Sequence, residues 1–169
     1  MENQLDRLLA AYCSPALAGI KPANLVSCDR TIYPDLPEQL ETYREAFAPR
    51  GMRFEIVCAC RARYLLLVHN EAQLERYMQD ERVQHVLRHF GYPVGSPLPE
   101  LLAVLRKRIA CTDGFPHEIG LFLGYPIEDV VGLFDIPVAA ASSAATGRFT
   151  VTQKRRPVCL TAYRGYVTQ

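Results

Sequence analysis

Residues 52–68 read MRFEIVCACRARYLLLV, and this stretch decides the fold. In its first half apolar and polar residues alternate, so Phe54, Ile56 and Cys58 share one side of an extended strand. A continuous apolar run follows at 64–68, and the short segment 61–63 between the two runs suits a tight connection. The pattern predicts an antiparallel β-hairpin.

Helices are predicted before and after this hairpin, and residues 24–28 read as a further short strand. Ser14 and Pro15 are expected to end the first helix, because proline lacks the N–H group that a helix interior needs. Apolar residues at helical spacing predict helices at 3–12, 37–48 and 98–110. Asn70 and Asp80 are expected to cap helices at 71–78 and 81–90, and short helices are expected at 116–123 and after 126. Together they predict an α+β fold: a small antiparallel sheet centred on the 52–68 hairpin, with helices packed against one of its faces.

The bulk composition is that of an ordinary globular protein. The 169 residues fit one domain, with 49% hydrophobic and 22% charged residues. The net charge of +1 offers no electrostatic case for nucleic acid or a membrane surface as a partner. The first residues lack the basic start and apolar core of a secretion signal. We therefore expect a cytoplasmic protein whose six cysteines are reduced thiols.

Cys13 is the first candidate for chemistry. It stands at the expected end of a helix, and Lys21 is a conceivable cationic neighbour in the same turn. A nucleophilic cysteine needs such a neighbour, or a helix N-terminus, to lower its pKa. The alternative is that Cys13 is a small buried hydrophobic residue, and the lack of an adjacent base favours it. Asn24 is expected to hold this turn through its side chain, and Lys21 and Asn24 are candidates for ligand binding.

His117 and Glu118 follow Pro116 at an expected helix start. His117 could act as a general base that Glu118 orients, or the two side chains could hold a metal. The free N–H groups of the helix start could instead bind an anion. The structural alternative is that Glu118 complements the helix dipole while His117 bonds to a neighbouring loop. Adjacent residues of a helix do not face each other, which favours this alternative.

No metal site is predicted, and the sequence leaves any cofactor unknown. His85 and His89 have a spacing that can chelate a metal, but the sequence shows no third ligand, and nearby arginines indicate a solvated face. Cys58 and Cys60 are expected on one face of the hairpin, where burial explains them as well as redox chemistry does. The sequence holds no glycine-rich phosphate loop and no GxSxG or HExxH motif.

Two segments carry a family resemblance. CSPALAGIKPANL at 13–25 and FPHEIGLFLGYPIEDVVG at 115–132 resemble the two signature stretches of an uncharacterised bacterial family, common in anaerobic Firmicutes, known as domain of unknown function 3793 (DUF3793). The resemblance covers about residues 3–132, and the second segment is the more specific. It implies no activity, because the family has none assigned.

The resemblance stops where a different sequence begins. Family members continue with a segment like GYWKVYGD and an amphipathic helix, whereas this chain has no tryptophan and continues LFDIPVAAASSAATGRFTVTQKRRPVCLTAYRGYVTQ. A shifted reading frame combines the last base of each codon with the first two bases of the next codon. Across the codon junctions from 145/146 to 159/160, the genetic code permits this shifted frame to encode YWKVYGDAEAAARLF. That sequence would restore the missing motif and a helix-forming run. We therefore interpret residues 133–169 as an out-of-frame tail, expected to be poorly packed or disordered, after a family domain at 1–132.

Two functions remain open from the sequence. The first is a non-catalytic accessory or binding domain of anaerobic bacteria, which holds a small anionic ligand or a partner protein through Lys21, Asn24 and His117. The second is a thiol- or histidine-dependent enzyme that brings Cys13 and His117 together. The separation of Cys13 and His117 in the fold discriminates between them.

Overall fold

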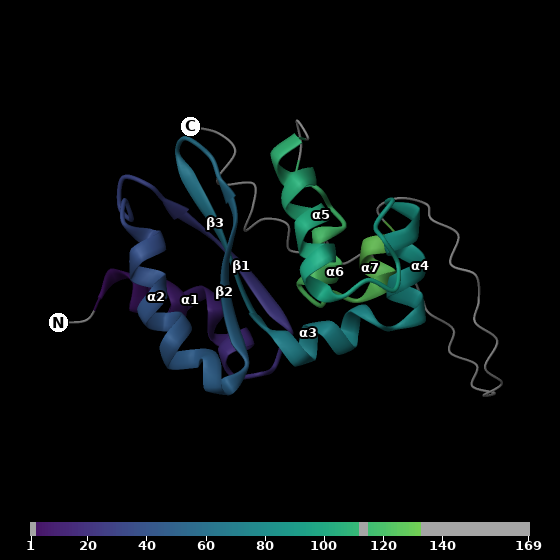
Figure 1. Cartoon of the computed structure of the whole chain (residues 1–169), viewed down its shortest axis with the longest axis horizontal. Helices are drawn as coiled ribbons and strands as arrows, with labels where there is room; N and C mark the ends of the chain where they lie inside the picture. Colours follow the sequence, from purple (N-terminus) through teal and green to yellow (C-terminus); the bar gives the residue numbers. More distant parts are fainter. Residues whose placement is uncertain (1–2, 112–114, 133–169) are drawn as a thin grey trace, which may run out of the picture. The chain divides into compact units, whose positions relative to one another are not determined.

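The predicted hairpin forms the centre of the sheet in the computed structural model, which describes residues 3–111 and 115–132. Strand β2 (Met52–Ala59) pairs antiparallel with β3 (Arg63–Asn70), and β1 (Ala23–Asp29) pairs antiparallel with the other edge of β3. The strand order is therefore β1-β3-β2 (Figure 1). This confirms the α+β class and the antiparallel sheet built on the hairpin.

The central strand β3 is apolar on both of its faces, which explains the continuous apolar run of its sequence. Tyr64, Leu66 and Val68 belong to one cluster of buried side chains, whereas Leu65 and Leu67 pack in another. Successive side chains of a strand point to opposite faces, so the two clusters lie on opposite sides of the sheet.

Helices α1 (Gln4–Leu17) and α2 (Leu36–Phe47) cover the first face. Their buried side chains include Leu5, Leu9 and Leu40, which pack with Phe54 of β2. We call this the α1–α2 cluster. After α2, the short 3-10 helix η1 (Ala48–Arg50) leads into β2.

The remaining helices cover the second face. They are α3 (Glu71–Met78), α4 (Glu81–His89), α5 (Leu98–Cys111), α6 (Ile119–Phe122) and α7 (Ile127–Val131). Leu74, Leu105 and Phe122 are completely buried there, in what we call the α3–α7 cluster. The expectation of helices on only one face is therefore wrong (Figure 1), because a central strand with two apolar faces needs cover on both.

Two local expectations need correction. Helix α1 does not end at Ser14 but continues through Pro15 to Leu17. Strand β2 has a bulge, since Ile56 faces Leu66 while Cys58 faces Leu65. The extra residue moves Cys58 to the face opposite Ile56, where strict alternation had not placed it.

The helix boundaries follow the capping residues of the sequence. The Oδ1 atom of Asn70 accepts a hydrogen bond from the N–H of Gln73, and Asp80 caps α4 in the same way. Pro37 lies in the first turn of α2. These boundaries are local features, which is why they could be predicted.

Residues 133–169, interpreted as an out-of-frame tail, lie outside the described residues. Within the part that is described, no helix has both the length and the apolar character that crossing a bilayer requires.

Candidate functional site

The first signature segment forms a turn that is held rigidly after α1. Pro15 lies inside the helix, and the N–H of Ala16 donates to Oδ1 of Asn24 at 3.0 Å. Gly19 adopts a left-handed conformation with φ of 73°, and the N–H of Ile20 donates a hydrogen bond to the carbonyl of Pro15 at 2.8 Å. The turn leaves the side chain of Ile20 77% exposed.

The second signature segment forms a turn between α6 and α7. Gly124 has a φ of 70°, and the N–H of Tyr125 donates to the carbonyl of Gly120 at 2.9 Å. A Cβ atom on Gly120 would lie 3.0 Å from Cγ2 of Val130, so the segment packs closely on itself. The ring of Tyr125 remains 40% exposed.

These two turns, about a hundred residues apart in the sequence, are in direct contact. A Cβ atom built on Gly124 would collide with the ring of Pro22, so the backbone of one turn touches the other. The Nζ atom of Lys21 lies 4.9 Å from the centroid of the Tyr125 ring, a cation–π contact.

Helix α3 fastens both turns from one of its faces. Gln73 donates to the carbonyl of Gly19 at 3.3 Å, and the hydroxyl of Tyr77 donates to the carbonyl of Tyr125 at 2.9 Å. Residues four apart on a helix are neighbours on its surface, so one short helix face positions both turns. We call the exposed patch formed by Ile20, Lys21 and Tyr125 the two-turn surface.

Two of the predicted ligand residues, Lys21 and Asn24, belong to the first signature segment. Lys21 belongs to the two-turn surface, and Asn24 lies at the start of β1, where its side chain accepts a hydrogen bond from the end of α1. His117 is instead exposed on the segment that leads into α6.

Cys13 lies in the α1–α2 cluster and is completely buried. Burial, and secondly the nearby thiol of Cys28, raise the pKa of Cys13 to about 12. At neutral pH it is therefore a protonated thiol, which is a poor nucleophile. Cys13 faces the sheet from one side, whereas α6, which follows the exposed His117, packs on the opposite side, so no common cleft opens on both residues.

Glu118 lies on the face of the sheet that α3 to α7 cover, and its contacts there are structural. Its side chain is almost fully buried, and its Oε1 atom accepts hydrogen bonds from Nε of Arg108 and, at 3.3 Å, from the hydroxyl of Tyr92. Arg108 also donates to the carbonyl of Phe90 at 3.1 Å. Glu118 therefore ties the end of α5 to the start of α6, a role that neither the dipole interpretation nor the catalytic one foresaw.

The sequence reasoning missed a cluster of Glu55, His69 and Arg106 between the sheet and α5. Nε2 of His69, whose side chain is 1% exposed, lies 3.3 Å from Oε1 of Glu55, and Arg106 pairs with the other carboxylate oxygen. The hydrogen bond from His69 is the main reason that the pKa of Glu55 lies below its usual value. Among the described residues, Nδ1 of His69 and Nε of Arg106 are buried without a hydrogen-bond partner. The polar positions of β2 were visible in the sequence, but their partners depend on strand pairing.

Comparison with known protein families gives a match over most of the chain. The model of a family described as "Protein of unknown function (DUF3793)" matches residues 9–144, which include both signature segments. No curated protein and no solved structure matches the chain.

Proposed function

Since the chain belongs to the DUF3793 family of proteins of unknown function, we propose from its geometry that it is a bacterial, cytoplasmic binding domain that holds a partner protein at the two-turn surface. The observation that carries this proposal is the rigid presentation of exposed Ile20 and Tyr125 by two distant segments.

The energetic argument starts from Ile20. Covering a fully exposed aliphatic side chain contributes about 1.5–3 kcal/mol to binding. A flexible loop would lose part of this gain to ordering, but the turn at Ile20 is already fixed by Gly19, Asn24 and Gln73. Tyr125, whose ring contacts Lys21, adds a large amphipathic ring that is 40% exposed, and tyrosine is enriched in interfaces.

The charge of the two-turn surface indicates the chemistry of the partner. Within the described part of the chain, Lys21 forms no ion pair with a carboxylate and rests on the ring of Tyr125. A partner with an apolar pocket for Ile20 and a carboxylate opposite Lys21 would complement both features.

The other sequence interpretations have less support. A small anionic ligand held by Lys21, Asn24 and His117 has less support, because Oδ1 of Asn24 already accepts a hydrogen bond from the N–H of Ala16. An enzyme that uses Cys13 and His117 would need a thiolate, and burial disfavours that form of Cys13.

Site-specific photocrosslinking in the producing cells tests the proposal. A benzophenone amino acid replaces Ile20 in one variant and the exposed Ile32 in a control. We expect a discrete crosslinked protein only from position 20, and we expect the purified partner to lose affinity for Ile20→Asp and Tyr125→Ala but not for Ile32→Asp. Equal crosslinking from positions 20 and 32, or unchanged affinity of the Ile20→Asp protein, contradicts the proposal.

A further inference from the structure

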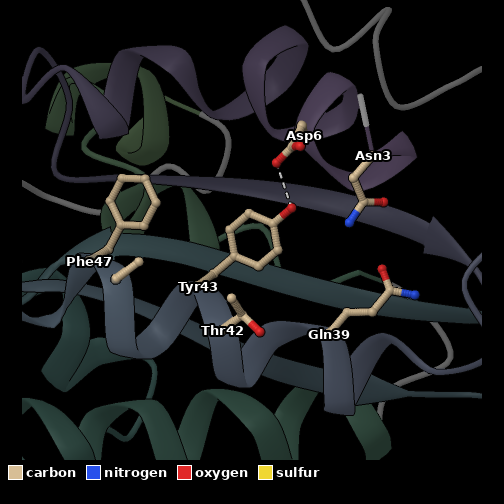
Figure 2. A pocket seen from close by; sticks show the side chains of 7 residues that line it. Asn3, Asp6, Gln39, Thr42, Tyr43 and Phe47 are labelled. Atoms are coloured by element: carbon tan, nitrogen blue, oxygen red, sulfur yellow. Dashed lines mark hydrogen bonds between the residues drawn. The ribbon is translucent and has the colours of Figure 1, made fainter. Parts of the chain in front are cut away.

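A second surface feature lies between the start of α1 and the outer side of α2. It is an open hollow of about 400 Å³, near the lower end of the range for ligand sites (Figure 2). Its lining consists of Asn3, Asp6, Gln39, Thr42, Tyr43, Ala46 and Phe47. None of these residues belongs to the two-turn surface, so the hollow is a separate feature of the molecule.

The aromatic part of the lining is firmly supported. Tyr43 and Phe47 are four residues apart on α2, and their ring centroids lie 5.9 and 5.5 Å from that of Phe54. Phe54 is a buried residue of β2. The hollow therefore has aromatic side chains anchored on the core, which fits a site that is formed before its ligand arrives.

The polar part of the lining is organised around Tyr43. Its hydroxyl donates to Oδ1 of Asp6 at 2.6 Å (Figure 2). Burial, followed by this contact with Asp6, raises the pKa of Tyr43 to about 12, so the hydroxyl remains a donor at neutral pH. The side chains of Gln39 and Thr42 make no hydrogen bond within the described part of the chain and are available to a ligand.

The charge of the lining selects the ligand class. Asp6 is the charged member of the seven lining residues. The guanidinium of neighbouring Arg44 is engaged by Glu41 and by the carbonyl of Phe54. An anion would be repelled by the carboxylate of Asp6, whereas a cation would be attracted by that carboxylate and by the faces of the aromatic rings.

We infer that this hollow is a binding site for a small hydroxylated organic cation, the chemistry of a protonated amino sugar. The ammonium group pairs with Asp6, the ring packs on Tyr43, and the hydroxyl groups bond to Gln39 and Thr42.

Titrations of the full chain with three related sugars test this inference. Glucosamine carries the cation, N-acetylglucosamine has the same ring without charge, and glucuronate carries an anion. We expect glucosamine to bind in the millimolar range and to shift the NMR signals of the Tyr43 ring. N-acetylglucosamine should bind about fivefold more weakly, which corresponds to about 1 kcal/mol for one partly solvated charge pair.

Variants assign the effect to the hollow. Asp6→Asn should abolish the preference for glucosamine, and Gln39→Ala should weaken both sugars to a similar degree. Asp35→Asn is the matched control, because Asp35 is exposed outside the hollow and makes no capping bond. Absence of binding, equal binding of charged and neutral sugars, preferred binding of glucuronate, or an unchanged preference in folded Asp6→Asn protein overturns the inference.

Discussion

Gly124 shows how a single residue can hold two distant segments together. Its φ of 70° already favours glycine, and its missing side chain leaves the space that the ring of Pro22 occupies. Either requirement alone would be satisfied at many positions, but the combination makes Gly124 sensitive to any substitution.

We predict that Gly124→Ala destabilises the protein by about 3 kcal/mol, from about 1 kcal/mol of left-handed strain plus the overpacking against Pro22. Gly95→Ala is the matched control, since Gly95 has a φ of 82° but open space around it, and it should lose only about 1 kcal/mol. Chemical denaturation measures both values. Adding Pro22→Ala to the Gly124→Ala protein should recover part of the lost stability. If Gly124→Ala and Gly95→Ala lose the same amount of stability, the contact with Pro22 is unimportant.

The cysteines provide a second prediction at the scale of residues. Cys60 is exposed, whereas Cys13 and Cys28 are buried and burial raises their pKa values to about 12 and about 11. Iodoacetamide at mildly alkaline pH should therefore alkylate Cys60 in the folded protein, and Cys13 and Cys28 only after denaturation. Peptide mass spectrometry identifies the modified residues. Rapid alkylation of Cys13 in the native state would instead support the thiol-dependent enzyme.

At the scale of elements, Glu55 links the sheet to α5 through His69 and Arg106. Arg44 also lies near enough to favour the Glu55 carboxylate. Because the pKa of Glu55 is lower in the folded than in the unfolded chain, its contribution to stability is present above its unfolded pKa of about 4.3. That contribution is lost as the pH falls through the lower, folded-state value.

We therefore predict that Glu55→Gln destabilises the protein at pH 7. When the pH is lowered to about 3, the variant should lose less additional stability than wild type does. Thermal denaturation across this range measures the difference. Glu71→Gln serves as a control, because Glu71 pairs with Arg53 in a more exposed ion pair that should contribute little. If the thermal stability of Glu55→Gln depends on pH in the same way as that of wild type, the predicted contribution of the Glu55 carboxylate is refuted.

Elements were predictable where their causes are local. The caps at Asn70 and Asp80 and the alternation in β2 depend on neighbouring residues, so they could be read directly. The path of α1 beyond Pro15 could not, because the N–H of Ala16 finds its acceptor on Asn24, in the next strand. The bulge near Cys58 likewise depends on the pairing of β2 with β3.

At the scale of the whole molecule, the reading-frame interpretation of residues 133–169 remains a proposal that the gene can test. Resequencing should find codons that spell YWKVYGDAEAAARLF in the shifted frame across the junctions from 145/146 to 159/160. A chain with the frame restored would then contain tryptophan, which the present chain lacks, and would show its fluorescence. Codons that cannot spell this segment in the other frame would exclude the interpretation.

The candidate site was only partly visible before folding. The two signature segments were recognised, and the side chain of Asn24 does hold the end of α1, although Asn24 itself lies in β1. Cys13 and His117 were singled out for their chemistry, yet one is buried in the α1–α2 cluster and the other is exposed before α6. Residue type indicates what a side chain can do, but burial and neighbours decide whether it can do so.

The sequence by itself determined the α+β class, the central hairpin and most helix boundaries, because periodicity, caps and turns act over a few residues. Only the tertiary structure decided that helices cover both faces of β3, that Glu118 is buried against Arg108, and that Pro22 meets Gly124. These contacts join residues that are far apart along the chain, and their existence depends on how the apolar faces of all the elements are buried together.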